Sequence, residues 1–207
     1  MKSLFRPDSN LMIVMTQITD CIFMSLFFMI GSVPVVTMGA SFAALYDAIY
    51  RGLRQGEKNS WQRFWHVYRT NWKGSILPTL VFFGASWALG YGMIQCWNAA
   101  VAQTISWSVF AALALVAMVL VGILSVLFPM LSRFDNSLGA LLRNTVILSL
   151  ANLPRTLALG IVNALSLFAC VRFVVPLFFL PGLAALIGSL LIEPMFRPYM
   201  PQEEAAE

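Results

Sequence analysis

The longest uncharged stretch of the sequence limits the fold more than any other feature. No Asp, Glu, Lys or Arg occurs from Gly74 to Ser132. A helix needs about 20 apolar residues to cross a bilayer. The stretch therefore predicts two membrane-spanning helices, over residues 75–97 and 104–129, with a turn at the polar residues 98–103.

The composition agrees with a membrane protein. Of the 207 residues, 59% are hydrophobic and 11% are charged, whereas an ordinary soluble domain is about 25% charged. So few charges cannot cover a soluble surface, which nearly excludes a soluble enzyme. We expect an all-α fold, a polytopic membrane helix bundle that forms one integral membrane domain over residues 1–207.

Three further spans are predicted, which brings the number to five. The first covers residues 10–33, and Pro34 and Gly39 should break the helical unit after it. The last two cover residues 154–171 and 173–193, with Arg172 near their turn because a charge at the bilayer centre is costly. A sixth span over residues 34–50 is the alternative, but that segment is short and carries Asp47.

Shorter helices are expected at the membrane interface over residues 40–54, 60–73 and 136–151. In residues 60–73, aromatic side chains recur at helical spacing with basic side chains between them. This pattern is typical of a helix that lies in the interface, and also of one packed on the cytoplasmic end of a bundle.

Lys and Arg predict the orientation. The connector from Arg51 to Lys73 carries six basic residues, and the positive-inside rule places it in the cytoplasm. With five spans the N-terminus is outside and the C-terminus is cytoplasmic, in a bacterial cell (inner or plasma) membrane, although Lys2 and Arg6 argue mildly against this. Six spans would put both ends inside. Basic residues beside the membrane favour anionic headgroups as the partner, and not nucleic acid.

Individual residues give weak chemical signals. His66 is the only histidine and has no metal ligand at a suitable spacing, so we expect no metal and no cofactor. Neither a phosphate-binding loop nor a G-x-S-x-G motif is present, so we do not expect an enzyme. Cys96 and Cys170 would both lie near the outer face, which leaves a disulfide between them open.

Charged residues at three places in the sequence have candidate roles. Asp20 lies inside the first span, where a carboxylate is a functional candidate, or it is solvated near the outer surface. Asp47 is expected to pair with Arg51 on one helix face. Beyond Pro129, Arg133, Asp135 and Asn136 form either a cap for the next helix or a docking surface; the cap is favoured.

Three motifs in order resemble the YesL family of uncharacterised bacterial membrane proteins. The first is an S-x-P-x-x-T-x-G-A pattern from Ser32 to Ala40, followed by A-A-L-Y ending at Tyr46. The second runs from Phe64 to Lys73 and includes Arg69 and Asn71. The third runs from Pro129 to Ser137. One departure is Ser25, where many relatives carry Asn.

The resemblance implies a link to carbohydrate uptake, because such proteins often accompany carbohydrate ABC importers. We expect a non-catalytic accessory component that contacts importer subunits; the alternative is a stand-alone, homo-oligomeric small-solute transporter or channel. The spans carry few ionisable groups for a polar path. The candidate functional or docking residues are Asp20, Pro34, Thr37, Gly39, Arg63, Arg69, Asn71, Arg133, Asp135 and Asn136.

Overall fold

The computed structural model describes residues 10–57, 59–134 and 137–199, and within them it contains helices and no strand. The long elements are α1 (Asn10–Gly31), α2 (Met38–Ile49), α3 (Ser60–Asn71), α4 (Ile76–Val101), α5 (Trp107–Arg133), α6 (Leu138–Ala151), α7 (Leu153–Arg172) and α8 (Leu180–Phe196). Short 3₁₀ segments are η1 (Val35–Thr37), η3 (Val175–Phe178) and η4 (Arg197–Tyr199), and η2 (Tyr50–Arg54) is π-helical.

Four described helices are long and apolar enough to cross a membrane, which confirms the expected helical membrane bundle. They are α4, α5, α7 and α8, the last extended to Tyr199. In α1, the apolar segment Met15–Gly31, over which the side chains are described, is shorter than these four. The prediction of five spans therefore depends on whether α1 crosses the membrane, and it stays a prediction.

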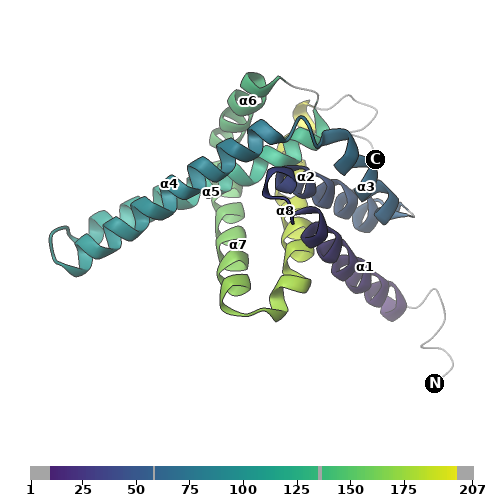
Figure 1. The fold of residues 1–207 in the computed structure, drawn as a ribbon, viewed down its shortest axis with the longest axis horizontal. Helices are drawn as coiled ribbons and strands as arrows, with labels where there is room; N and C mark the ends of the chain where they lie inside the picture. The colour runs from purple at the N-terminus through teal and green to yellow at the C-terminus, as the bar shows by residue number, and fades with distance from the viewer. Residues whose placement is uncertain (1–9, 58, 135–136, 200–207) are drawn as a thin grey trace.

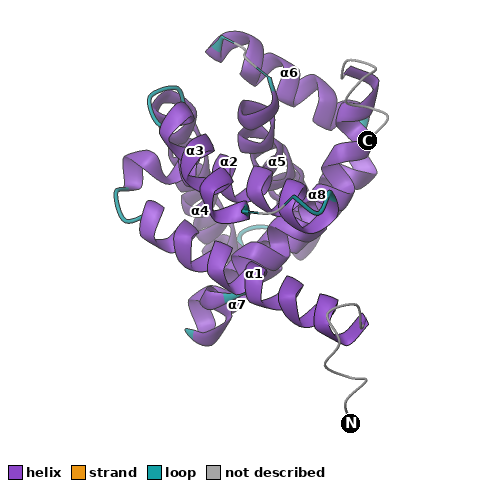
Figure 2. Cartoon of the chain, turned by 90° about the vertical axis from the view of Figure 1, so that its right-hand side faces the viewer, coloured by secondary structure: helices purple, strands orange, loops and turns teal. Residues whose placement is uncertain are grey.

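Two hairpins leave the body of the molecule in different directions. Helices α4 and α5 run side by side and project far from the other helices, whereas α7 and α8 form a second hairpin (Figure 1). Helices α1, α2 and α3 pack together near the point where the hairpins meet. Figure 2 shows α1 crossing the lower part of the bundle beside α8, which it contacts.

Helix α2 is the centre of the fold and packs inside the bundle; the sequence predicted an interfacial connector helix over residues 40–54. Every residue from Gly39 to Ile49 is buried except Phe42. The physical reason is its run of small side chains, because Ala, Gly and Ser allow neighbouring helices to approach closely. Helices α1, α3, α4, α5 and α8 all contact it.

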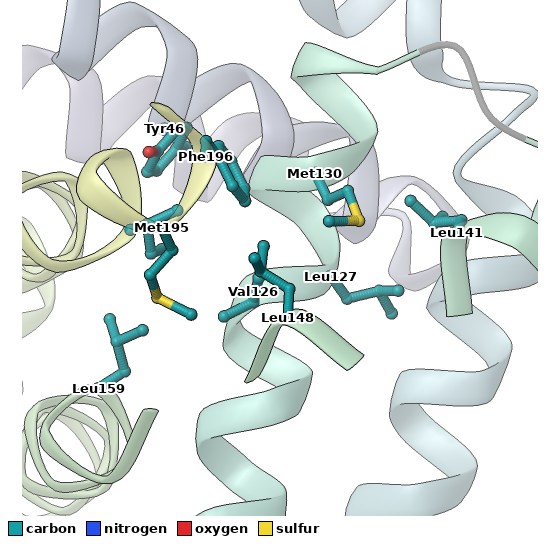
Figure 3. Close-up of a cluster of buried hydrophobic side chains, with 10 residues drawn as sticks. Tyr46, Val126, Leu127, Met130, Leu141, Leu148, Leu159, Met195 and Phe196 are labelled. Atoms are coloured by element: carbon teal, nitrogen blue, oxygen red, sulfur yellow. The ribbon is translucent and has the colours of Figure 1, made fainter. Parts of the chain in front are cut away.

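Two hydrophobic clusters meet at α2. One joins α2 to α5, α6, α7 and α8 and contains Tyr46, Val126, Leu127, Met130, Leu141, Leu148, Leu159, Ile192, Met195 and Phe196 (Figure 3). The other joins α1, α2 and α3 and contains Cys21, Met24, Phe28, Ala44, Leu45, Ala48, Ile49, Phe64 and Val67. The outer halves of α4 and α5 lie outside both clusters.

The predicted break after the first span is confirmed at Pro34 and corrected at Gly39. Helix α1 ends at Gly31, and Pro34 precedes η1. Gly39, in contrast, lies within α2. A side chain there would collide with Thr79 of α4 and come 2.6 Å from a ring carbon of Phe128 of α5. Gly39 therefore serves close packing and does not end a helix.

The hairpin ends differ from the sequence prediction in detail. Helix α5 continues through Pro129 to Arg133, so this proline lies inside the helix, where it removes one intrahelical hydrogen bond. The span predicted from residue 173 begins as a helix only at Leu180. Pro176 lies in η3, and Pro181 occupies the first turn of α8, a position that suits proline. Arg172 ends α7 beside the turn, as predicted.

Helices α5 and α7 cross through a reciprocal pair of glycines. A Cβ at Gly122 of α5 would collide with the carbonyl oxygen of Thr156, and one at Gly160 of α7 would collide with the carbonyl oxygen of Met118. The two backbones can be this close only because both residues lack a side chain. This contact connects the two hairpins.

Candidate functional site

A buried carboxylate joins three helices. Arg133, the last residue of α5, donates from Nη2 to Oε1 of Glu193 in α8 over 2.8 Å, and the two side chains are only 6% and 8% exposed. The hydroxyl of Tyr46 in α2 donates to the same oxygen over 2.9 Å. Burial, and then the nearby Glu193 charge, raise the pKa of Tyr46 well above its usual value, so its phenol stays protonated and donates.

The ring of Tyr50 connects this carboxylate to the π-helical segment η2. The guanidinium carbon of Arg133 lies 4.2 Å from the ring centroid, and that of Arg54 lies 5.3 Å from it. Arg54 also donates from Nη1 to the carbonyl oxygen of Ser189 in α8 over 3.0 Å. These cation–π and hydrogen-bond contacts attach η2 to α5 and α8.

A second buried carboxylate, Asp47, joins α2 to α3. Its side chain is 1% exposed and accepts from Nε of Arg63 over 2.6 Å. Arg51 approaches the other oxygen at 3.4 Å, which confirms the ion pair predicted at this helical spacing. Arg51 also pairs with Glu57 at 3.4 Å. The contact with Arg63 is the shorter one and was not predicted from the sequence.

We call these residues the ionic cluster: Tyr46, Asp47, Tyr50, Arg51, Arg54, Arg63, Arg133 and Glu193. Each buried carboxylate is held by an arginine, so the charges compensate each other in a poorly hydrated place. Within the described part of the chain no three His, Cys, Asp or Glu residues come together as metal ligands. The arrangement ties α2, α3 and η2 to the hairpin helices α5 and α8.

Two cavities lie beside α3 and the segment before it, and of the two only the smaller is lined by residues of the ionic cluster. The larger, about 690 Å³, lies between α1 and the segment from Gly52 to Trp61, and Asp20 and Glu57 are among its lining residues. The smaller, about 220 Å³, lies between α3 and the end of α5. Its polar lining consists of Arg63, His66, Thr70, Asn71, Ser132 and Arg133.

The smaller cavity brings together three of the residues singled out from the sequence, Arg63, Asn71 and Arg133. Arg69 is exposed on α3, and its side chain is not part of this lining. Asp20 lies in the other cavity. Asp135 and Asn136 lie outside the described residues.

The remaining predicted residues have structural positions. The hydroxyl of Thr37 lies within hydrogen-bonding distance of two carbonyl oxygens, 3.1 Å from that of Gly31 and 2.9 Å from that of Pro34, so it closes the turn between α1 and α2. Ser25, the departure from the resembling family, is fully buried. It donates to the carbonyl oxygen of Cys21 and accepts from the backbone N–H of Gly182, 2.9 Å away in α8.

Helix α3 packs on the bundle with part of its aromatic face. Phe64 is completely buried and Val67 nearly so, against α1 and α2. Trp61 and Trp72 remain exposed. The expectation of packing on the bundle is thus confirmed for the middle of the helix, and interfacial contact of its two exposed tryptophans stays a prediction.

Comparison with known proteins finds a family model that matches part of the chain. Residues 11–93 match the family model described as "Protein of unknown function, DUF624". No curated protein and no solved structure matches the chain. The matched residues include Tyr46, Asp47 and Arg63 of the ionic cluster, whereas Arg133 and Glu193 lie beyond them. The four long apolar helices make the chain a multi-pass helical membrane protein, and the description of the matched family names no activity.

Sequence reasoning missed Tyr46 and Glu193. Glu193 had a usable signal, since it is a lone carboxylate near the end of an apolar span, and such a residue is a functional candidate by default. Tyr46 had no such signal, because a tyrosine in an apolar segment gives no information about a distant hydrogen-bond partner.

Proposed function

We propose that the protein is a non-catalytic accessory component of carbohydrate ABC-type uptake in a bacterial cell membrane, and that it acts by contact. The observation that carries this proposal is the projecting α4–α5 hairpin, whose apolar outer part is mostly uncovered by the rest of the chain (Figure 1).

The uncovered surface is large and continuous along the hairpin. In α4 the buried residues are Pro78, Thr79 and Ala100, and in α5 burial begins only at Gly122. Large apolar side chains are exposed elsewhere on these helices, namely Leu77, Leu80, Val81, Trp87, Tyr91, Ile94, Trp97, Val101, Trp107, Val109, Leu113, Leu115, Val116 and Leu120. In a bilayer such a surface contacts lipid tails or the helices of another membrane protein.

The ionic cluster supports a role in which contact with a partner is transmitted from the α4–α5 hairpin to the rest of the protein. Helix α5 belongs to the hairpin at one end and ends in Arg133 at the other. A protein docked on the hairpin would thus be connected through Glu193 and Tyr46 to α2. From there, Asp47 and Arg63 lead to the basic connector, which the positive-inside rule places in the cytoplasm.

The importer is favoured as partner by the three motifs that resemble a family accompanying carbohydrate importers. A contact function without catalysis is favoured by the chemistry of the cluster. Its two buried carboxylates, Asp47 and Glu193, are both engaged by arginines, and an arginine stays protonated in proteins.

The test is affinity purification from native membranes in mild detergent, followed by quantitative mass spectrometry. We expect membrane subunits of a carbohydrate importer to be enriched with the tagged chain, and Trp87→Gln in α4 to reduce their recovery. Trp61→Gln is the matched control, because Trp61 is also exposed but lies on α3.

Recovery of the chain without importer subunits would contradict the proposal. Substrate flux in liposomes that contain this protein alone would instead support a stand-alone transporter.

A further inference from the structure

We propose that the smaller cavity, between α3 and the end of α5, binds a phosphate group, and that the phosphate diester of an anionic phospholipid is its source. We call it the α3–α5 cavity; its lining residues are Arg63, His66, Val67, Thr70, Asn71, Leu131, Ser132, Arg133 and Phe134. The inference does not depend on any partner protein.

The charge of the wall selects an anion. Arg63, His66 and Arg133 line the cavity, and no described lining residue is a carboxylate. Asp47 and Glu193, which pair with the two arginines, are not lining residues. Each guanidinium carries five N–H donors, so one carboxylate partner leaves donors for a ligand.

Arg133 supplies the observation that points most directly to a missing partner. Its side chain is only 6% exposed, yet its Nε–H has no hydrogen-bond partner among the described residues. A buried charged donor without a partner is costly. The guanidinium that carries this donor belongs to a residue that lines the cavity, where an anion can pair with the charge of Arg133.

The other polar side chains of the cavity already donate hydrogen bonds within their own helices. The Thr70 hydroxyl, the Asn71 amide and the Ser132 hydroxyl each donate to a backbone carbonyl one helical turn away. The donors that remain for an anion are therefore those of the arginines and of His66, together with the second N–H of the Asn71 amide. Arginine forks match the oxygens of phosphate in a bidentate geometry.

The position of the cavity favours a lipid as the source. Helix α5 ends at Arg133, and α4 begins at Ile76, just after α3. Both helices are candidate spans, so the cavity lies at the end of a membrane hairpin, at the level where lipid headgroups are found. His66 and Thr70 are exposed, which makes the cavity accessible from outside the protein.

The experiment measures binding to the full-length protein in neutral detergent with two probes. One is fluorescent-tailed phosphatidylglycerol, with fluorescent-tailed phosphatidylcholine as the zwitterionic reference. The other is inorganic phosphate, tested as a competitor and by direct calorimetry. We expect saturable binding of phosphatidylglycerol at least tenfold tighter than that of phosphatidylcholine.

Two pairs of variants distinguish binding in the α3–α5 cavity from binding to the positively charged surface in general. Arg63→Gln and His66→Glu should each raise the dissociation constant of phosphatidylglycerol at least tenfold. Arg69→Gln and Gln62→Glu make the same kinds of charge change on α3 outside the cavity lining, and they should stay within about twofold. Arg63 also pairs with Asp47, so Arg63→Gln could unfold the protein. In that case His66→Glu tests the cavity, because His66 forms no ion pair among the described residues.

The outcomes are distinct. Phosphatidylglycerol binding that millimolar phosphate does not displace supports the lipid source. Saturable phosphate binding, weakened by His66→Glu, supports the phosphate site and assigns it to a soluble ligand. Equal weakening by Arg69→Gln and Arg63→Gln, or by Gln62→Glu and His66→Glu, would overturn the proposal. So would the absence of saturable binding for both probes.

Discussion

Arg133 and Glu193 are 60 residues apart in sequence, yet their side chains form a 2.8 Å ion pair that is almost completely removed from solvent. The pair connects the ends of two candidate membrane helices, α5 and α8. Its Glu193 oxygen is also the acceptor for Tyr46 of the central helix α2. Three elements of the bundle therefore depend on one carboxylate.

Removing one charge of this pair should be costly. Glu193→Gln leaves Arg133 buried without a compensating charge, and we expect a loss of about 3–5 kcal/mol in the free energy of unfolding. The double variant Arg133→Met, Glu193→Gln should lose less than the sum of its two single variants. Detergent titrations followed by tryptophan fluorescence give these values.

Glu57→Gln is the matched control for that prediction. It breaks the ion pair between Glu57 and Arg51, in which the Glu57 side chain is 44% exposed. Such surface pairs contribute about 0–1 kcal/mol. Additive losses in the double variant, or equal losses for Glu57→Gln and Glu193→Gln, would argue against a coupled buried pair.

The two arginines of Asp47 should be unequal. Arg63 lies 2.6 Å from the carboxylate and Arg51 lies 3.4 Å from it. Arg63→Gln should therefore lower the unfolding free energy more than Arg51→Gln, by about 1–3 kcal/mol. Thermal unfolding of both variants, monitored by size-exclusion chromatography with fluorescence detection, gives the order. The reverse order would mean that the ion pair of Asp47 with Arg51 contributes more to the free energy of unfolding than the ion pair of Asp47 with Arg63.

The glycine crossing of α5 and α7 should not tolerate a side chain. Gly122→Ala forces a Cβ against the backbone of Thr156, and we expect a loss of about 1–3 kcal/mol. Gly92→Ala in α4 is the control, because the space around its Cβ is open among the described atoms. Alanine there should be neutral or stabilise the helix by up to about 1 kcal/mol. Equal effects at both positions in unfolding titrations would contradict a tight crossing.

Cys96 and Cys170 should react as separate thiols. All three cysteines are free, and Cys96 and Cys170 lie near the far ends of α4 and α7, which point in different directions (Figure 1). We expect both to be labelled by maleimide after denaturation without a reductant. Labelling that requires prior reduction, with Cys96→Ser restoring reactivity at Cys170, would indicate a disulfide.

The orientation is testable with reporter fusions at Pro7 and Gln202. The basic connector from Arg51 to Lys73 predicts the first site outside and the second in the cytoplasm. Opposite sidedness requires an odd number of spans, so α1 would then cross together with the four long helices. Both reporters in the cytoplasm would instead require an even number.

The membrane helices could be predicted from the sequence because an uncharged run is a local property. The run from Gly74 to Ser132 predicted α4 and α5 to within a few residues at each end. Pro34 predicted the break after α1 for the same reason, since proline acts on its own turn. The ion pair of Asp47 with Arg51 was likewise visible in the helical spacing.

The site could not be predicted in the same way, because its partners are distant in sequence. Nothing near Tyr46 or Arg133 shows that Glu193 lies against both. The central place of α2 was missed because its alanines and its one glycine, Gly39, give no strong hydrophobic periodicity. Their small size becomes meaningful only when the neighbouring helices are known, as at Gly39 against Thr79 and Phe128.

The most direct test of the contact function is site-specific photocrosslinking in native membranes. A photoreactive phenylalanine analogue at Trp87, an exposed residue of α4, should form a crosslink to a membrane subunit of a carbohydrate importer. The same analogue at exposed Phe168 of α7 is the control, and it should give little of that product. Crosslinks from Trp87 only to lipid or to a second copy of this chain would contradict the account.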